Sequence, residues 1–348
     1  MWEDCLDILK PIFKKHDIKI LQIGLEPSDL SFSKVFNISG QMNQNQQAYV
    51  INKAELHLGV DSFSNHLASF FNKKIVSLFS DSPPANTGPL FGDENDACLM
   101  IPALKDGQFS YSAEEQSKAI NTIKAEDIAR NVCEALGLPF DYEYETVHVG
   151  ADYLARSVEF IPVGNAIDAA SLNIDSLIVR MDLQFDEMVL AQQLQACRCS
   201  IVTEKPISTK LLSHFKNKIC QFVYLIGEHD SKQYVEELYS TGIQCLLMSE
   251  KGGEELNKLK FKYLDFGKIH ARNTPNKKDL DFLKSQDLDN LYYRSSKFLI
   301  KGGQTFYGKA ALDGETPTFM LGAKDLHKVI DNETFWKESD NYIFLKRV

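Results

Sequence analysis

The first ~140 residues alternate between two hydrophobic patterns, one with the period of an amphipathic helix and one typical of short buried strands. Helical spacing predicts helices at residues 2–13, 43–53, 62–71 and 125–136. Asn43 or Asn45 is the expected cap of the second of these helices, and Ser62 that of the third. Short apolar runs predict buried strands at residues 18–23, 35–39, 55–59 and 74–79. Residues 80–92 are rich in proline, asparagine and glycine and are expected to form a loop.

The second half of the chain repeats this alternation before the pattern changes near residue 270. Strands are expected at residues 158–163, 176–181, 200–203, 221–226, 244–248 and 262–266. Helices are expected at residues 187–197 and 231–240. Beyond residue 270 short strands are expected at residues 292–301, 305–307 and 342–345, with Gly302-Gly303 as a hairpin turn.

Alternating strands and helices predict an α/β fold built from parallel sheets with helices on both faces. Because 348 residues exceed one typical domain, we expect two Rossmann-like lobes and a short β-rich C-terminal segment. The polar stretch around residues 140–155 places a boundary between them. The predicted parts are a nucleotide-sugar-binding lobe at residues 1–145, a second α/β lobe at 151–275 and an appendage at 276–348.

Composition narrows the function classes. The net charge of −10 argues against a protein that grips nucleic acid, since an acidic surface repels phosphate backbones. Seven irregularly spaced cysteines fit reduced thiols better than a disulfide framework, and no spacing of ligands suggests a metal site. No signal pattern or apolar run of about 18 residues is visible, so no membrane span and a cytoplasmic location are expected.

The segment Leu56–Ala68 carries the most chemical information. A strand ends at Gly59, a sharp turn holds Asp61 and Ser62, and a helix begins at once. The first N–H groups of a helix lack intrahelical partners, and together with the helix dipole they form an anion site that could hold a diphosphate. Asp61 could then accept hydrogen bonds from sugar hydroxyls. A structural interpretation stays open, in which Ser62 only caps the helix and Asp61 only favours its start.

The stretch HLGVDSFSNHLASFFNKKIVSLFSDSPPANTGPL, residues 57–90, resembles the donor-binding segment of the ADP-heptose lipopolysaccharide heptosyltransferase family. That family shows a strand, then Gly-Val-Asp-Thr/Ser-Gly, two further residues and His-Leu-Ala. A second strand ending in Leu-Phe-Gly and a loop with Gly-Pro follow. Weaker similarity at residues 37–51 and 123–128 extends the resemblance over roughly residues 1–138.

The resemblance implies a GT-B glycosyltransferase, with two Rossmann-like lobes, that moves a sugar from a nucleotide-sugar donor to a glycan, lipid or other hydroxyl acceptor. It further implies an inverting reaction without a metal or other cofactor. Asp61 would contact the donor sugar, and the amides of Ser62 and Phe63 would hold the diphosphate. His66 would face the cleft, and Thr87 and Gly88 would belong to a loop near the donor. For His66 a bond to a nearby backbone group, and for Thr87-Gly88 an ordinary turn, are the structural alternatives.

Three departures from the family pattern matter. Phe63 stands where the family has a glycine, which would let a phosphate approach the backbone closely. The strand and the loop with a basic residue that normally open this lobe are not found ahead of Trp2, and the lobe that normally comes second stands first. We hypothesise a permuted order in which residues 151–270 form the acceptor lobe and residues 158–163 supply the missing strand.

The best general base for such a transfer lies in Arg180–Glu187, where acids cluster after a predicted strand. Asp186 or Asp182 could take the role, whereas the structural alternative is a solvated loop that favours a helix start. Lys205 and His229 also follow predicted strands, but an exposed lysine and a loop histidine explain them equally well.

Two other functions remain open at this point. The chain could be a non-catalytic glycosyltransferase-like binding protein, which Phe63 and the missing strand would favour. It could also be a phage-type sugar transferase acting on modified DNA, against which the acidic charge argues.

Overall fold

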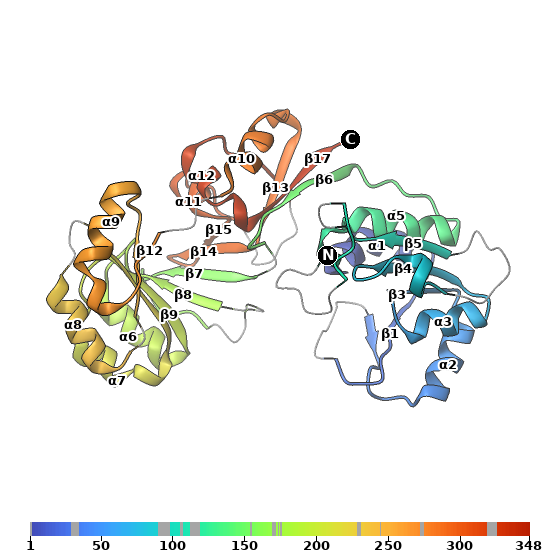
Figure 1. Ribbon diagram of the computed structural model, residues 1–348, viewed down its shortest axis with the longest axis horizontal. Coiled ribbons are helices and arrows are strands. Elements are labelled where there is room, and N and C mark those ends of the chain that lie inside the picture. Colours follow the sequence, from blue (N-terminus) through green and yellow to red (C-terminus); the bar gives the residue numbers. More distant parts are fainter. Residues whose placement is uncertain are drawn as a thin grey trace. The chain divides into compact units, whose positions relative to one another are not determined.

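The computed structural model describes residues 2–28, 35–89, 98–104, 107–111, 119–153, 155–168, 172, 174, 176–227, 231–243, 245–271, 275–318 and 326–348. The chain divides into two compact units, unit 1 with residues Met1–Glu145 and Val348, and unit 2 with residues Thr146–Arg347 (Figure 1). Both units combine parallel strands with helices, which confirms the expected α/β class.

Unit 1 alternates strands and helices over its first 80 residues. Its elements are α1 (Trp2–Lys15), β1 (Ile20–Gln22), β2 (Val35–Asn37), α2 (Gln44–Lys53), β3 (Leu56–Val60), α3 (Phe63–Phe70), β4 (Lys74–Phe79), α4 (Pro84–Thr87), β5 (Cys98–Pro102), the 3-10 helix η1 (Ala119–Thr122) and α5 (Ala125–Leu136). Strands β3, β4 and β5 form a parallel sheet in that order, and β1 pairs with β2 in a separate parallel pair. The sequence alone does not predict β5.

Strand β4 supplies both hydrophobic cores of unit 1 because successive side chains point to opposite faces of a sheet. Val76 and Leu78 pack among the apolar residues of α1 and α5. Ile75 packs on the other face, with Ile51 of α2 and Ala68 of α3. The helices α1 and α5 therefore cover one face of the sheet, and α2 and α3 cover the other (Figure 1).

The helix ends of unit 1 follow from local chemistry. Asn43 caps α2: its side chain accepts the N–H of Gln46, whose side chain in turn accepts the N–H of Asn43. Gly137 ends α5 with a φ of 68°, a conformation that glycine adopts without steric cost. The predicted bounds of α5 are confirmed, and Asn43 rather than Asn45 is the cap of α2.

Unit 2 is built on one large sheet. Its helices and strands begin with β6 (Tyr144–Val149), β7 (Ser157–Ile161), β8 (Ser176–Arg180), α6 (Glu187–Ala196), β9 (Cys199–Thr203), α7 (Thr209–His214), β10 (Ile219–Leu225), α8 (Lys232–Thr241), β11 (Cys245–Ser249) and α9 (Gly253–Lys262). They continue with the 3-10 helix η4 (Leu264–Phe266), β12 (His270–Ala271), α10 (Lys277–Lys284), β13 (Leu291–Ser295), β14 (Lys297–Lys301), β15 (Gln304–Phe306), α11 (Lys309–Asp313), β16 (His327–Lys328), α12 (Glu333–Lys337), the 3-10 helix η6 (Ser339–Asn341) and β17 (Tyr342–Arg347).

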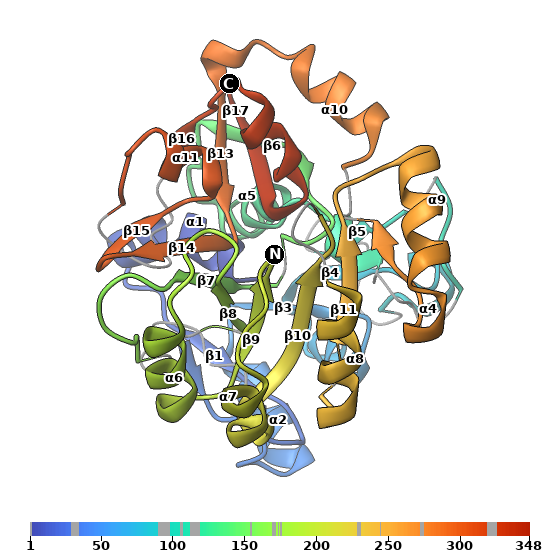
Figure 2. The ribbon, with the colours of Figure 1, turned by 90° about the vertical axis from the view of Figure 1, so that its left-hand side faces the viewer.

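Among the described residues the large sheet has the order β12-β11-β10-β9-β8-β7-β14-β15, parallel except for β15 (Figure 2). Strands β14 and β15 come from residues 276–348, the predicted appendage, and so extend the sheet of the second lobe. The hairpin between them turns at Gly302-Gly303, where both φ angles are positive, as the sequence predicts. A smaller sheet follows the order β16-β13-β17-β6.

Three sequence predictions are wrong. Residues 262–266 form the end of α9 and η4 instead of a strand, because Leu256, Leu259 and Tyr263 face the core at helical spacing. The predicted strand 292–301 is two strands in different sheets, β13 and β14. Residues 158–163 do not supply a missing strand to the first lobe, because β7 lies between β8 and β14 in unit 2.

A chain of buried charges crosses one face of the large sheet. Arg180 donates to both carboxylate oxygens of Asp182, at 2.8 and 2.6 Å, and also to Glu159. The Lys297 ammonium lies 2.9 Å from Glu159 and 2.8 Å from Glu338. All of these side chains are buried, so each ion depends on its neighbours to replace lost hydration.

The Glu159 carboxylate is the centre of this chain of ions. Burial by itself would raise its pKa, but the Lys297 ammonium and the Arg180 guanidinium outweigh burial and hold the pKa below its ordinary value. The same contacts work in the opposite sense on Lys297, whose pKa burial would lower and the Glu159 and Glu338 carboxylates raise.

Replacing Glu159 with glutamine is expected to lower the free energy of unfolding by about 3–5 kcal/mol, because it leaves two buried cations with one fewer counter-ion. The pKa of Glu159 is lower in the folded state than the ordinary 4.5, so its stabilisation is complete above about pH 4.5 and is lost as the pH falls through the folded value. Urea unfolding between pH 7 and pH 3 measures both effects. The exposed Glu254→Gln serves as the control, and an equal loss in both variants would contradict the role of the buried ions.

Candidate functional site

The turn between β3 and α3 is the core of the candidate site. Strand β3 ends at Val60, and the Asp61 N–H donates to the carbonyl of Leu78 in β4 at 3.0 Å, which ties the turn to the sheet. Ser62 has extended backbone angles at the N-cap position, but its side chain makes no cap hydrogen bond. Its hydroxyl lies 2.8 Å from that of Ser64 instead. Ser62 is therefore the N-cap residue, as the sequence predicts, but its side chain does not bond the helix start.

Asn65, which the sequence alone does not single out, fixes the geometry of this turn. Its side chain is 1% exposed, and its amide nitrogen donates to the Val60 carbonyl at 2.8 Å and the Ser77 hydroxyl at 2.5 Å. The side chain thus links the end of β3 to β4 from within the first turn of α3. Gly59 lies directly against it: a Cβ there would be 3.5 Å from Asn65 Oδ1 and 3.1 Å from His57 Nε2.

The start of α3 presents free hydrogen-bond donors. The Asn65 N–H donates to the Ser62 carbonyl at 3.1 Å, and the described residues offer no acceptor to the N–H groups of Ser62, Phe63 and Ser64. The Asp61 carboxylate beside them likewise has no hydrogen-bond partner within the described part of the chain. Three unpaired amides at the positive end of a helix dipole form a site for an anion such as a diphosphate.

Phe63 and His66 lie on the first turn of α3. Phe63 is its first residue, a helical position open to any residue, and its ring is 61% exposed. The helix start therefore does not need the glycine that the family has here. His66 is half-buried and has no hydrogen bond within the described residues. The structural alternative, a bond from His66 to a nearby backbone group, is therefore not observed there. Contact of either residue with a donor stays a prediction.

A second segment begins at the same edge of the sheet. Because β3 and β4 are parallel with Val60 opposite Leu78, the residues that follow β4 leave at the edge where Asp61 lies. They form α4 and then Gly88, whose N–H donates to Pro84 at 2.7 Å. A Cβ on Gly88 would lie 2.4 Å from the Pro84 oxygen, so only glycine fits, and Thr87 Oγ1 lies 2.7 Å from Ser82 Oγ.

Tyr111 is a further residue at this edge that the sequence gives no reason to choose. Its N–H donates to the Asp81 carbonyl at 3.0 Å, which holds it beside the segment after β4. Its φ is 51°, unusual for a bulky residue, and its ring is 71% exposed. Strained, exposed residues of this kind concentrate at binding sites.

His57 lies beneath the helix start, with Nε2 3.1 Å from the Ser64 hydroxyl. Burial lowers the pKa of His57 below its ordinary 6.5, so the ring is neutral at neutral pH. Its hydrogen-bond chain runs through Ser64 to Ser62. The ring therefore orients the two hydroxyls at the anion site without adding a charge.

The two candidate bases in unit 2, Asp182 and Asp186, differ in how many of their carboxylate oxygens have hydrogen-bond partners. Asp182 is held by Arg180 through both of its oxygens. Asp186 caps α6: its Oδ1 accepts the N–H groups of Met188 and Val189 at 2.9 and 3.0 Å. Its Oδ2 has no partner within the described part of the chain. The geometry thus favours Asp186 over Asp182 as a proton acceptor, and the catalytic role stays a prediction.

The other candidate residues, Lys205, His229 and the cysteines, give no support for a catalytic or metal-binding role. Lys205 is exposed after β9, where its N–H and carbonyl both bond the Thr203 hydroxyl, and His229 lies outside the described residues. Within the described ranges no group of three or more His, Cys, Asp or Glu side chains could hold a metal ion. Burial raises the pKa of the Cys5, Cys199 and Cys245 thiols to about 12, so these cysteines are not nucleophiles at neutral pH.

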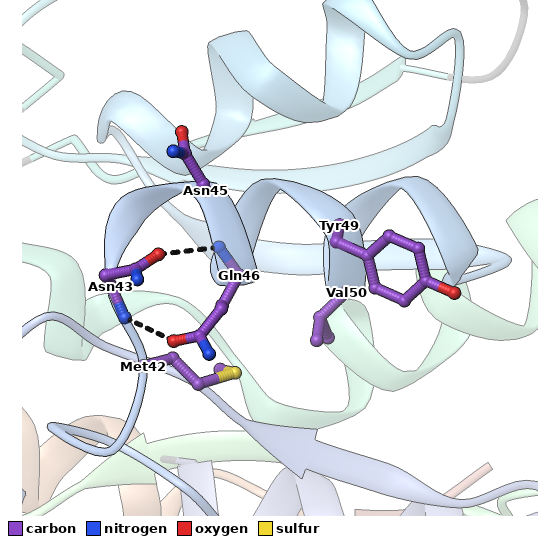
Figure 3. A pocket seen from close by; sticks show the side chains of 6 residues that line it. All are labelled: Met42, Asn43, Asn45, Gln46, Tyr49 and Val50. Atoms are coloured by element: carbon purple, nitrogen blue, oxygen red, sulfur yellow. Dashed lines mark hydrogen bonds between the residues drawn. The ribbon is translucent and has the colours of Figure 1, made fainter.

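A shallow groove of about 390 Å³ runs along the outer side of α2 (Figure 3). Its lining residues carry no charge: they are Met42, Asn43, Asn45, Gln46, Tyr49 and Val50. Figure 3 shows that Asn43 and Gln46 bond each other's backbone there, so the side chains that line the groove also begin the helix.

A comparison with protein families finds a match. Residues 26–116 match the model of glycosyltransferase family 9 (heptosyltransferase). This part of the chain is therefore similar to that family. Neither the curated proteins nor the solved structures contain a match to the chain.

The matched segment begins between β1 and β2 and ends beyond Tyr111, and so includes β3, α3, β4 and α4. It therefore contains all of the candidate donor residues and the unpaired amides. The resemblance inferred from residues 57–90 is confirmed by this match. Of the helices in the described residues, none has the length and apolar character needed to cross a membrane.

Replacing Asn65 with alanine is expected to lower the free energy of unfolding by about 1–3 kcal/mol, because the Val60 carbonyl and the Ser77 hydroxyl lose their buried donor. Hydrogen exchange should also become faster at the amides of residues 60–66. Asn52→Ala, an exposed change on α2, is the control. Equal stability and equal exchange in the two variants would show that Asn65 does not hold the turn.

Proposed function

We propose that the protein transfers a sugar from a nucleotide-sugar donor to a hydroxyl acceptor, with inversion at the anomeric carbon and without a metal ion. The observation that carries the proposal is the set of unpaired N–H groups at Ser62, Phe63 and Ser64, inside the segment that matches family 9. Backbone donors that are fixed before binding stabilise the charge of a leaving diphosphate without reorganising.

The donor side of the reaction is assigned to unit 1. The diphosphate accepts hydrogen bonds from the amides at the start of α3, and Asp61 accepts hydrogen bonds from hydroxyls of the transferred sugar. Thr87 and Gly88 belong to the loop that borders the donor at the same sheet edge. Tyr111 offers an exposed ring on which a nucleobase can stack.

The acceptor side is assigned to unit 2, the second α/β unit of the chain. Asp186 Oδ2 takes the proton of the acceptor hydroxyl while the acceptor oxygen bonds to the anomeric carbon. The bond from that carbon to the donor phosphate oxygen breaks, and the nucleoside diphosphate leaves with the electron pair. Asp182 positions the segment that follows β8 through its paired contacts with Arg180.

A second candidate function is donor binding without transfer. Phe63 favours it, because a phenyl ring in place of the family's glycine would shift a bound donor from the position that transfer requires. Both functions require donor binding, so only a measurement of sugar transfer distinguishes a transferase from a binding protein.

Asp186→Asn is expected to lower the rate of sugar transfer by about 10²–10⁴, the usual contribution of a general base, while donor binding is kept. The donor is chosen first from a panel of ADP-, GDP- and UDP-sugars by thermal shift, since a ligand at about 100 times its Kd adds about 2.7 kcal/mol of stability. Release of nucleoside diphosphate then measures turnover.

Glu187→Gln, one residue further along, is the matched control and is expected to keep most of the activity. No thermal shift with any nucleotide sugar would contradict donor binding. A shift without turnover in the unmodified protein would favour the binding protein, and full activity of Asp186→Asn would remove Asp186 as the base.

A further inference from the structure

Helix α9 and the 3-10 turn η4 expose apolar residues where an amphipathic helix normally carries polar ones. The inner face is conventional: Leu256 and Tyr263 are buried in the core of unit 2, and Leu259 is half-buried. On the outer side Phe261 is 82% exposed and Leu264 is 69% exposed. Their spacing of three residues on near-helical backbone makes them neighbours on the surface.

Lysines surround this exposed pair. Lys258, Lys260 and Lys262 lie on the last two turns of α9, and Lys268 follows η4. The one acid among them, Asp265, lies 3.5 Å from the ammonium of a further lysine, Lys232. The cationic end of α9 thus differs from the chain as a whole, whose net charge is −10.

The acidic residues of α9 lie at its other end. Glu254 and Glu255 occupy the first turn, and Glu255 pairs with Lys251 at 3.3 Å. Favourable interaction with the helix dipole accounts for acids at the start and lysines at the end. It does not account for an exposed phenylalanine and leucine between the lysines.

We propose that this end of α9 is a docking surface for an anionic lipid bilayer. Phe261 and Leu264 enter the boundary between headgroups and acyl chains, and the surrounding lysines lie against the lipid phosphates. Charge complementarity selects this occupant, because two apolar side chains ringed by cations match an apolar layer beneath an anionic surface.

The edge position of α9 suits a flat partner. The helix lies beside β11 and β12, at one end of the large sheet of unit 2 (Figure 1). The lysines are needed because the net negative charge of the chain is repelled by anionic lipid, and two apolar side chains alone give only weak, reversible binding. The lysines and the two apolar side chains are both needed, so removal of either set is expected to release the protein from the bilayer. The inference is independent of the proposed transfer reaction.

Co-sedimentation with vesicles tests the proposal directly. The full chain is expected to bind vesicles in which about a third of the phosphatidylcholine is replaced by phosphatidylglycerol, and not vesicles of phosphatidylcholine alone. Phe261→Ser/Leu264→Ser and, separately, Lys258→Gln/Lys260→Gln/Lys262→Gln should each lower the partition coefficient by about tenfold or more. Raising the salt to about 0.5 M should lower it for the unmodified protein.

Two matched variants control for exposure and for charge. Met188→Ser removes an apolar side chain that is 75% exposed on α6, and Lys14→Gln/Lys15→Gln removes an exposed lysine pair at the end of α1. Both should bind like the unmodified protein. All of the replaced side chains except the partly covered Lys260 are exposed, and unchanged thermal unfolding would show that the variants are folded.

Failure of the unmodified protein to bind anionic vesicles overturns the proposal. Equal binding to neutral vesicles, or equal binding by the α9 variants, does so as well. If light scattering shows self-association that only Phe261→Ser/Leu264→Ser abolishes, without lipid binding, the surface joins copies of the chain and the lipid assignment is wrong.

Discussion

The site depends on one constraint: the backbone leaves β3 and enters α3 so abruptly that three successive peptide N–H groups find no acceptor in the described part of the protein. Unpaired donors at a helix start are costly when buried and useful when a ligand can reach them. Asn65 maintains this arrangement from below, by joining the end of β3 to β4 through its amide nitrogen. Gly59 permits it, since a larger residue would press on Asn65 and His57.

The second unit depends on a different kind of contact. Its buried ions join residues from β7, β8 and β14 with Glu338, so segments separated by more than a hundred residues must meet in one register. Such a network adds little net stability compared with apolar packing, but it penalises any arrangement in which one partner is missing. It also ties β14, far along the chain, to its place beside β7, next to the edge strand β15.

Local features of the fold could be predicted from the sequence, and long-range ones could not. The reciprocal cap of Asn43, the glycine that ends α5 and the turn at Asp61 each depend on a few consecutive residues. Residues 262–266 look like a strand because Tyr263, Leu264 and Phe266 are aromatic or apolar, although Leu264 is 69% exposed. Glu159, Lys297 and Asn65 resemble ordinary surface residues in the sequence, because their partners are distant or lie under the helix. The proposed function rests on the family resemblance at residues 57–90, since neither pattern nor composition identifies a sugar donor.

Removal of one amide proton at the start of α3, with the helix kept, tests most directly whether these amides bind the donor. Proline is well tolerated at the first helical position and has no N–H, and the extended angles of Ser62 suit the residue before a proline. Phe63→Pro and Phe63→Ala differ mainly in that one donor. Calorimetric titration with the nucleoside diphosphate of the preferred donor should show binding about tenfold weaker for the proline variant than for the alanine variant, and equal binding of the free nucleoside. Equal diphosphate affinity in the two variants would contradict the claim that these amides receive the donor.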